Sequence, residues 1–224
     1  MQPSYLYQIF SIMMKDLRSE FRTRYAISSV FLFVLVTITM IIFSLRGEEI
    51  SNRELSALLW ITFFFGSMTG LSKSFVSEEE RQTSLFLKVC LPSFAVYFGK
   101  LLFNIILSLA INIISSVLFY FLLDFVPQSL FLFLLILILS SLGIGSSTTI
   151  ISAIISKANN RGAIFPILSF PVLLPLILLG IEATTMALEN ASLNSVQNDL
   201  LILLSYSGVI IPISYILFDF VWQE

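Results

Sequence analysis

The sequence predicts an all-α membrane protein that crosses the bilayer six times. Of its 224 residues, 57% are hydrophobic and only 12% are charged, and the mean hydropathy is +0.97. Soluble domains carry about 25% charged residues, so burial in a globular core does not account for this composition. Six long apolar runs separate the charged segments, and a bilayer core about 30 Å thick needs roughly 20 apolar residues of helix to be crossed.

The predicted spans are joined by short connections. Their ranges are 26–45, 55–72, 101–123, 129–155, 162–181 and 200–218. Residues 125–128 are predicted to form a tight turn before the fourth span, because Pro127 removes a backbone donor and ends a helix. The longest connection, 73–100, leaves no room for a soluble domain, so we treat 1–224 as one transmembrane domain.

The first 25 residues are predicted to form an amphipathic helix along the membrane surface. Apolar side chains recur at three- and four-residue steps, with basic side chains largely on the other side. The apolar set is Leu6, Ile9, Phe10, Met13, Leu17 and Phe21. This helix is either a simple topological anchor or a contact for a partner. The segment lacks the apolar core and cleavage site of a signal peptide.

The distribution of basic residues predicts the orientation. Ten of the twelve Lys and Arg residues lie in residues 1–25, in connection 73–100 and in the connection after the fourth span, and the other two, Arg46 and Arg53, lie in the first connection. Basic residues collect on the cytoplasmic side of a membrane protein. We therefore expect a multi-pass protein of the bacterial inner membrane with both termini in the cytoplasm.

Three spans carry residues that indicate close helix packing. Gly66 and Gly70 form a GxxxG spacing, which predicts internal packing first and oligomerisation, such as a homodimer, second. In the third span Asn104, Ser108 and Asn112 form a polar stripe, which predicts hydrogen bonds between helices rather than conduction. The fourth span is rich in serine, glycine and alanine, which also suits tight packing.

The fifth span contains Pro166, Pro171 and Pro175. Each proline removes a backbone donor, so the three together predict a kinked or broken helix. Such a helix survives in a membrane where neighbours satisfy the freed carbonyls, which places this span inside the bundle or near an interface. The kink is either a mechanical hinge or a static packing feature.

The residues for most membrane chemistry are missing from the chain. There is no histidine, which excludes His-ligated heme and imidazole-dependent proteolysis for this chain alone, and the single Cys90 excludes an internal disulfide. Charged residues are absent from the middle of the spans, which disfavours a self-powered ion-coupled transporter. No P-loop is present. We therefore expect no enzyme activity, no cofactor or metal in this chain, and membrane lipid but no nucleic acid as a partner.

The connection 73–100 has the most unusual composition. Three acidic residues, Glu78, Glu79 and Glu80, precede a short amphipathic segment that ends at Pro92, on the side where basic residues collect. Taken alone, this pattern is either a docking surface for a cytoplasmic partner or a solvated run of charge beside an interfacial helix.

The order of these parts resembles the membrane subunits of ABC-2 type exporters. Two stretches are similar to one family within that class, cytochrome c maturation protein B, also called heme exporter protein B or CcmB. The first stretch is 75–85 with Pro92 and Gly99-Lys100 following, and the second runs from Pro171 through Pro175 to Gly180. The sequence departs from that family's pattern at Arg81 and Gln82, where an acidic residue and a glycine are expected.

The resemblance implies that the chain works in a complex with a separate ATPase. The expected partners are a CcmA-like ABC ATPase and CcmC-, CcmD- and CcmE-like proteins, with ATP bound by the ATPase and heme as the expected cargo of the complex. Residues 81–91 would form a coupling helix, with the acidic cluster at its start and the fifth span yielding as the complex moves. The residues expected to couple to the ATPase are Glu78, Glu79, Glu80, Arg81, Thr83, Leu85, Phe86 and Leu87.

Three alternatives remain open at the level of sequence. One is an ABC-2 permease that exports a lipid or a polysaccharide, and another is a membrane scaffold that transports nothing. An intramembrane enzyme is a third class, which the missing catalytic groups disfavour.

Overall fold

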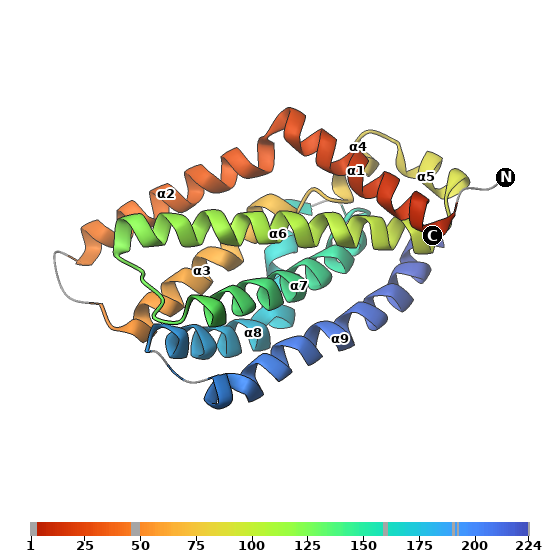
Figure 1. Ribbon diagram of the computed structural model, residues 1–224. Helices are drawn as coiled ribbons and strands as arrows, with labels where there is room; N and C mark the ends of the chain where they lie inside the picture. The colour runs from red at the N-terminus through yellow and green to blue at the C-terminus, as the bar shows by residue number, and fades with distance from the viewer. Residues whose placement is uncertain (1–3, 46–49, 159–160, 190, 192, 224) are drawn as a thin grey trace.

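The computed structural model describes residues 4–45, 50–158, 161–189, 191 and 193–223, and within these ranges the chain is helical and has no strand (Figure 1). The helices are α1 (Tyr5–Thr23), α2 (Tyr25–Leu45), α3 (Asn52–Leu71), α4 (Val76–Glu80), α5 (Ser84–Cys90), α6 (Ser93–Leu123), α7 (Leu130–Ile155), α8 (Arg161–Leu188) and α9 (Leu193–Gln223).

The all-α, six-span prediction is confirmed. In the described part of the chain, six helices are long and apolar enough to cross a membrane, namely α2, α3, α6, α7, α8 and α9. The helices are longer than several predicted spans: α6 begins at Ser93, and α9 covers Leu193–Gln223. Hydropathy marks only the part of a helix inside the hydrocarbon, whereas the backbone hydrogen bonds continue beyond it. As expected, residues 124–129 are not helical, and α7 starts after Ser129.

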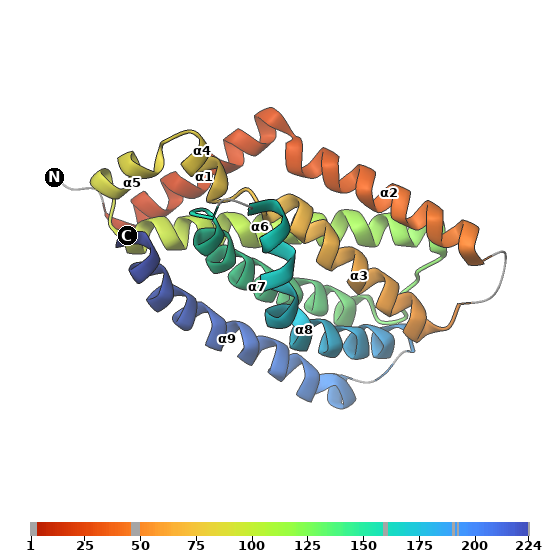
Figure 2. The same ribbon diagram turned by 180° about the vertical axis from the view of Figure 1, so that it is seen from behind.

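Helix α7 lies at the centre of the bundle and packs against α6, α8 and α9 (Figures 1 and 2). Helix α3 forms a second line of contacts with α2, α6 and α8. The small residues of α7 allow this close packing: a Cβ added to Gly145 would lie 2.9 Å from the backbone Cα of Ile105 in α6. Helix α2 and helix α9 lie at the outside of the bundle.

The two glycines of the GxxxG spacing face the inside of the protein. A Cβ on Gly66 would lie 3.4 Å from Ile111 and 3.6 Å from Val30, and one on Gly70 would lie 2.6 Å from Ile111. Val30 belongs to α2 and Ile111 to α6, so the glycines let α3 fit between these two helices. This geometry corresponds to internal packing, the first of the two interpretations of the motif.

The bundle has two distinct ends. In both ribbon views the start of α1, the end of α9 and the short helices α4 and α5 lie at one end, and the turn between α6 and α7 lies at the other (Figures 1 and 2). Lys157, after α7, lines the same small hollow as Lys88 of α5. The segments rich in Lys and Arg therefore share one end of the bundle. In the first connection Arg53 is described, whereas Arg46 falls outside the described residues.

The amphipathic helix α1 meets α2 at a sharp elbow. Arg24 adopts a left-handed backbone conformation with φ of 51°, and the Glu20 carboxylate accepts hydrogen bonds from the backbone N–H groups of Ala26 at 2.7 Å and Ile27 at 3.3 Å. These groups at the start of α2 have no partner within the helix, so Glu20 caps it. On α1, Ile9 and Ile12 are buried against the bundle, and a Cβ on Gly99 of α6 would lie 2.7 Å from Ile12.

Helix α8 remains continuous through its three prolines but changes direction along its length (Figure 2). The Tyr206 hydroxyl of α9 donates a hydrogen bond to the Val172 carbonyl oxygen at 2.8 Å, and it lies 2.9 Å from the Ser147 hydroxyl of α7. Two neighbouring helices thus supply a polar contact close to Pro175, as expected for a bent helix in a membrane.

Candidate functional site

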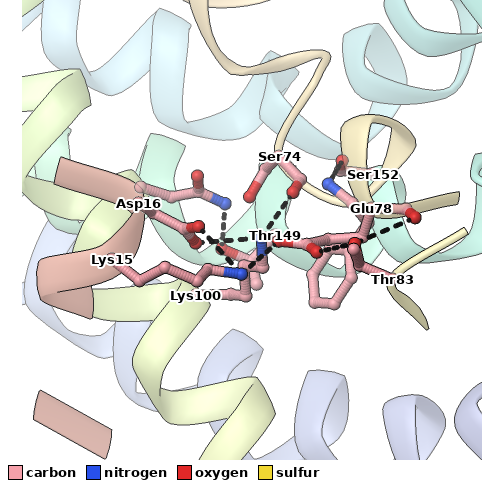
Figure 3. A network of polar contacts seen from close by, with 10 residues as sticks. Lys15, Asp16, Ser74, Glu78, Thr83, Lys100, Thr149 and Ser152 are labelled. Carbon is pink, nitrogen blue, oxygen red and sulfur yellow. Dashed lines mark hydrogen bonds and ion pairs between the residues drawn. The ribbon is translucent and has the colours of Figure 1, made fainter. Parts of the chain in front are cut away.

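Four charged side chains meet at the end of the bundle that carries α4 and α5. Lys15 and Asp16 come from α1, Glu78 comes from α4 and Lys100 comes from α6, and we call these four residues the ion cluster (Figure 3). The cluster contains two ammonium groups and two carboxylates, so its charges balance. It joins the surface helix α1, the connection between α3 and α6, and the membrane-spanning helix α6.

Lys100 occupies the centre of the ion cluster and is 1% exposed. Its ammonium forms an ion pair with Asp16 Oδ2 at 2.9 Å, and it donates hydrogen bonds of 2.8 Å to Glu78 Oε1 and of 2.8 Å to the Ser74 carbonyl oxygen. Two of the three N–H donors of the ammonium are thus used in hydrogen bonds, and the Asp16 carboxylate adds a second negative charge beside it. A buried lysine keeps its charge only with such partners, so the position of Lys100 depends on α1 and α4 together.

Glu78 receives partners from three directions. Its carboxylate accepts hydrogen bonds from Lys100, from Lys15 and from the Thr83 hydroxyl, and Glu78 is 7% exposed. Partial burial lowers the pKa of Lys15, but the carboxylates of Asp16 and Glu78 outweigh burial and raise that pKa above its usual value. Lys15 therefore stays charged at neutral pH, and each lysine of the cluster pairs with both carboxylates.

The base of the connection is attached to the membrane helices. The Phe75 N–H donates to the Ser152 hydroxyl of α7 at 3.1 Å. The Phe75 ring packs against Phe218 and Trp222 of α9, with ring centroids 5.4 Å and 6.1 Å away. Together with the ion cluster, these contacts connect one short segment to α1, α6, α7 and α9, so a displacement of this segment would act on all four helices.

The tip of the connection, in contrast, presents apolar side chains to the outside. On α5, Leu85 and Phe86 are each 68% exposed and Val89 is 87% exposed, whereas Leu87 is buried. These three exposed residues form what we call the α5 apolar face. Cys90 at the end of α5 is also exposed. The contrast between a fixed base and an exposed apolar tip suits an element that docks on another protein.

The predicted coupling residues thus divide into two groups. Glu80, Arg81 and Thr83 are exposed and Glu79 is partly exposed, but Glu78 points into the protein.

The helix predicted at 81–91 begins only at Ser84, because Gln82 has φ of 56° and ends the preceding turn. A left-handed residue favours glycine, which is what the resemblance leads one to expect at this position.

Both asparagines of the polar stripe of α6 are hydrogen-bonded to α7. The Asn104 amide donates to the Thr149 hydroxyl at 2.8 Å, and the Asn112 amide donates to the Ser141 hydroxyl at 3.0 Å. Lys100 stands four residues before Asn104 on the same face, so the ion cluster continues directly into this seam. Sequence reasoning identified the stripe but missed Lys100, Asp16 and Lys15; continuing the four-residue step from Asn104 back to Lys100 was the available signal.

The residues of this site are suited to connecting helices rather than to holding a metal. Among the described residues, no group of three or more Cys, Asp or Glu side chains is arranged to hold a metal ion, and the sequence contains no histidine. Each charged group of the ion cluster lies within ion-pair distance of opposite charges in the same cluster. What the arrangement does is hold one surface helix, one connection and one membrane helix in a fixed relation.

These features define the class as a multi-pass, all-helical membrane protein. The family model for CcmB protein matches residues 7–216, and the chain therefore belongs to the CcmB family. At the level of the family, this makes it an ABC-type permease of the heme-export and cytochrome c maturation system. None of the curated proteins matches the chain.

Proposed function

We propose that this chain is the permease subunit that receives mechanical work from a separate, CcmA-like ABC ATPase during cytochrome c maturation. The observation that carries the proposal is the α5 apolar face on a connection whose base is attached to α1, α6, α7 and α9. The family supports a permease rather than an ATPase, so ATP is bound and hydrolysed by the partner.

In this proposal the ATPase docks on α5, with Leu85, Phe86 and Val89 as the apolar contact and Glu79, Glu80 and Arg81 at its edge. ATP-driven closure of the ATPase pushes on α5. The ion cluster passes the displacement to α1 and α6, and Phe75 passes it to α7 and α9, as rigid elements do in two-state transitions. The bent helix α8 is the element that yields.

Heme is the expected cargo of the complex, but this chain has no histidine to ligate it. Holding the heme therefore falls to partners of the CcmC, CcmD and CcmE type. Work done on this subunit either moves heme across the membrane or releases the heme-loaded chaperone on the periplasmic side, and the absence of histidine favours the second process. The expected location is the bacterial inner membrane.

The docking surface is tested by placing a charge on it. Val89→Asp, alone and together with Phe86→Asp, should abolish copurification of the ATPase, because a carboxylate would have to be desolvated in an apolar contact. The matched control is Val126→Asp, which changes an exposed valine, 56% accessible, at the other end of the bundle. That control should retain the ATPase at wild-type stoichiometry.

Charge reversal at Glu79 and Glu80 gives the second arm of this experiment. Loss of the ATPase in these variants as well would assign the edge of the contact to the acidic cluster. Full ATPase binding by Val89→Asp with Phe86→Asp would refute docking on α5.

A further inference from the structure

A cavity of about 360 Å³ lies beneath the elbow between α1 and α2, beside the ion cluster. Its walls come from α1, α2, the end of α3, the connection that contains α4, and α6. The volume is within the range of ligand pockets, which is about 300–1,000 Å³. The proposed coupling path uses Asp16 and Lys100 at one wall of this cavity, and the ATPase contact has Glu80 and Arg81 at its edge. Lys73 and the Ser74 hydroxyl have no role in either.

The lining contains charged groups that have no charged partner. Lys73, Glu80 and Arg81 form no ion pair with another described residue. Lys73 places its ammonium 3.9 Å from the ring centroid of Tyr25, at the rim of the cavity. These cations are available to a ligand with negative charge.

Ser74 adds a buried donor to the same wall. It is 6% exposed, and its hydroxyl has no hydrogen-bond partner among the described residues. A buried hydroxyl without a partner is costly, and a ligand oxygen in the cavity would satisfy it. Lys73, Ser74 and Arg81 together supply the donors that a phosphate group requires.

The cavity is also balanced in charge. The lining contains three carboxylates, Asp16, Glu20 and Glu80, and three cations, Lys73, Arg81 and Lys100, so it has no net charge. Glu20 uses one carboxylate oxygen, Oε1, to cap α2. A purely anionic ligand would leave the carboxylates of Glu20 and Glu80 without a counter-charge, whereas a ligand with one phosphate and one ammonium group matches both signs of charge.

The remaining part of the lining is apolar and lies farther along α6 toward the membrane. Phe103 and Leu107 contribute to the cavity, and the adjacent Leu102 and Ile106 are exposed on the outer face of the same helix. A molecule held here therefore has its polar part among the charges and a path for an apolar part along a lipid-facing surface.

We propose that this cavity binds the headgroup of a zwitterionic phospholipid, with the phosphate at Lys73, Arg81 and Ser74 and the ammonium at Glu80 and Glu20. The bound lipid would connect the elbow to the connection that contains α4. This inference does not rest on the proposed ATPase docking, because it concerns lipid bound by the chain itself.

The test is native mass spectrometry of the full-length protein purified from bilayers of equal phosphatidylethanolamine and phosphatidylglycerol. The wild type should retain phosphatidylethanolamine in preference to phosphatidylglycerol. Lys73→Gln should reduce the retained phosphatidylethanolamine about tenfold, which is the effect of one charge-assisted hydrogen bond. Lys157→Gln, an exposed lysine at the same end but outside this cavity, should retain lipid as the wild type does.

A second variant and two soluble competitors complete the experiment. Glu80→Gln removes one of the two carboxylates proposed for the ammonium, so it should reduce the preference between the two lipids while leaving the thermal unfolding midpoint unchanged. Soluble glycerophosphoethanolamine should compete with the lipid, and inorganic phosphate should not. Equal retention of both lipids by the wild type, unchanged retention in Lys73→Gln, or displacement by inorganic phosphate alone would each overturn the proposal.

Discussion

Lys100 is a charged residue that the protein keeps almost entirely away from solvent, with a side chain 2% exposed. Its three oxygen partners belong to α1, to α4 and to the segment between α3 and α4. A charge in such a position is stabilised only while all three segments keep their places. At the scale of the residue, the stability of the buried Lys100 charge therefore depends on correct assembly of the connection on the bundle.

Replacing Lys100 by methionine keeps most of the side-chain volume and removes the charge. Asp16 and Glu78 then share Lys15 as their only cation, and loss of one partner from a buried ion pair costs about 3–5 kcal/mol. We expect Lys100→Met to lower the midpoint of thermal unfolding in detergent by several degrees.

The double variant Lys100→Met with Glu78→Gln restores the balance of one cation and one anion. It should recover part of the lost stability, which separates an effect of charge from an effect of packing. Unfolding of Lys100→Met at the wild-type temperature would contradict the role given to the ion cluster.

The candidate site was only partly predictable from the sequence. The acidic cluster and the exposed Leu85 and Phe86 lie in a connection of unusual composition, and that composition can be read directly. The inward orientation of Glu78 cannot be read, because it depends on Lys15 and Lys100, which come from two other helices. Three consecutive glutamates look alike in a sequence, and only their tertiary partners distinguish them.

At the scale of the element, the crossing of α3 and α8 is the tightest glycine contact that the structure describes. A Cβ on Gly180 would lie 1.8 Å from Trp60 Cζ2. Four residues along α8, the Thr184 hydroxyl accepts a hydrogen bond of 2.9 Å from the Trp60 indole N–H. Trp60 is fully buried, so its ring cannot move aside without displacing the helices around it.

Gly180→Ala should therefore destabilise the protein, by about 1–3 kcal/mol or more, because an extra methyl group is forced into a packed crossing. The control is Gly208→Ala in α9, where an added Cβ meets no atom within 4 Å. Alanine is the better helix former by up to about 1 kcal/mol, so that control should be neutral or stabilising. Thermal denaturation of both variants measures the unfolding midpoint, which should fall for Gly180→Ala and stay or rise for Gly208→Ala. Equal midpoints would contradict this account of the crossing.

The bend of α8 also belongs to this scale. The prolines predicted a kink or a break, and the helix bends without breaking. The sequence of α8 alone does not decide between the two outcomes, because Tyr206 and Ser147, which lie close to the bend, come from α9 and α7. Whether α8 works as a hinge remains part of the proposed function.

At the scale of the whole molecule, the six helices were predictable because each is a run of apolar residues bounded by charges or by Pro127. Their exact ends were not, since α6 and α9 continue as helices well beyond the hydrocarbon. The order of packing around α7 could not be predicted either. It depends on which small residues meet which neighbours, and a pattern of serines and glycines does not specify that.

The orientation of the bundle leads to a labelling experiment. Cys90 is the only cysteine of the chain and is exposed at the end where the basic segments collect. The distribution of Lys and Arg predicts that this end is cytoplasmic. A maleimide that does not cross membranes should label Cys90 in inverted vesicles and not in intact spheroplasts. The matched control, Val126→Cys in a Cys90→Ser background, should show the opposite pattern. Labelling of Cys90 in intact spheroplasts would contradict the predicted orientation and place this end of the bundle in the periplasm.

The α5 apolar face also bears on how the protein must be produced in a cell. Leu85, Phe86 and Val89 are large apolar side chains on a segment outside the membrane spans. In a newly synthesised copy they are exposed to solvent until a partner binds there. Such a copy is prone to self-association and to recognition by chaperones and proteases. Overproduction of this chain by itself should therefore yield less intact protein than synthesis alongside whatever normally covers that helix.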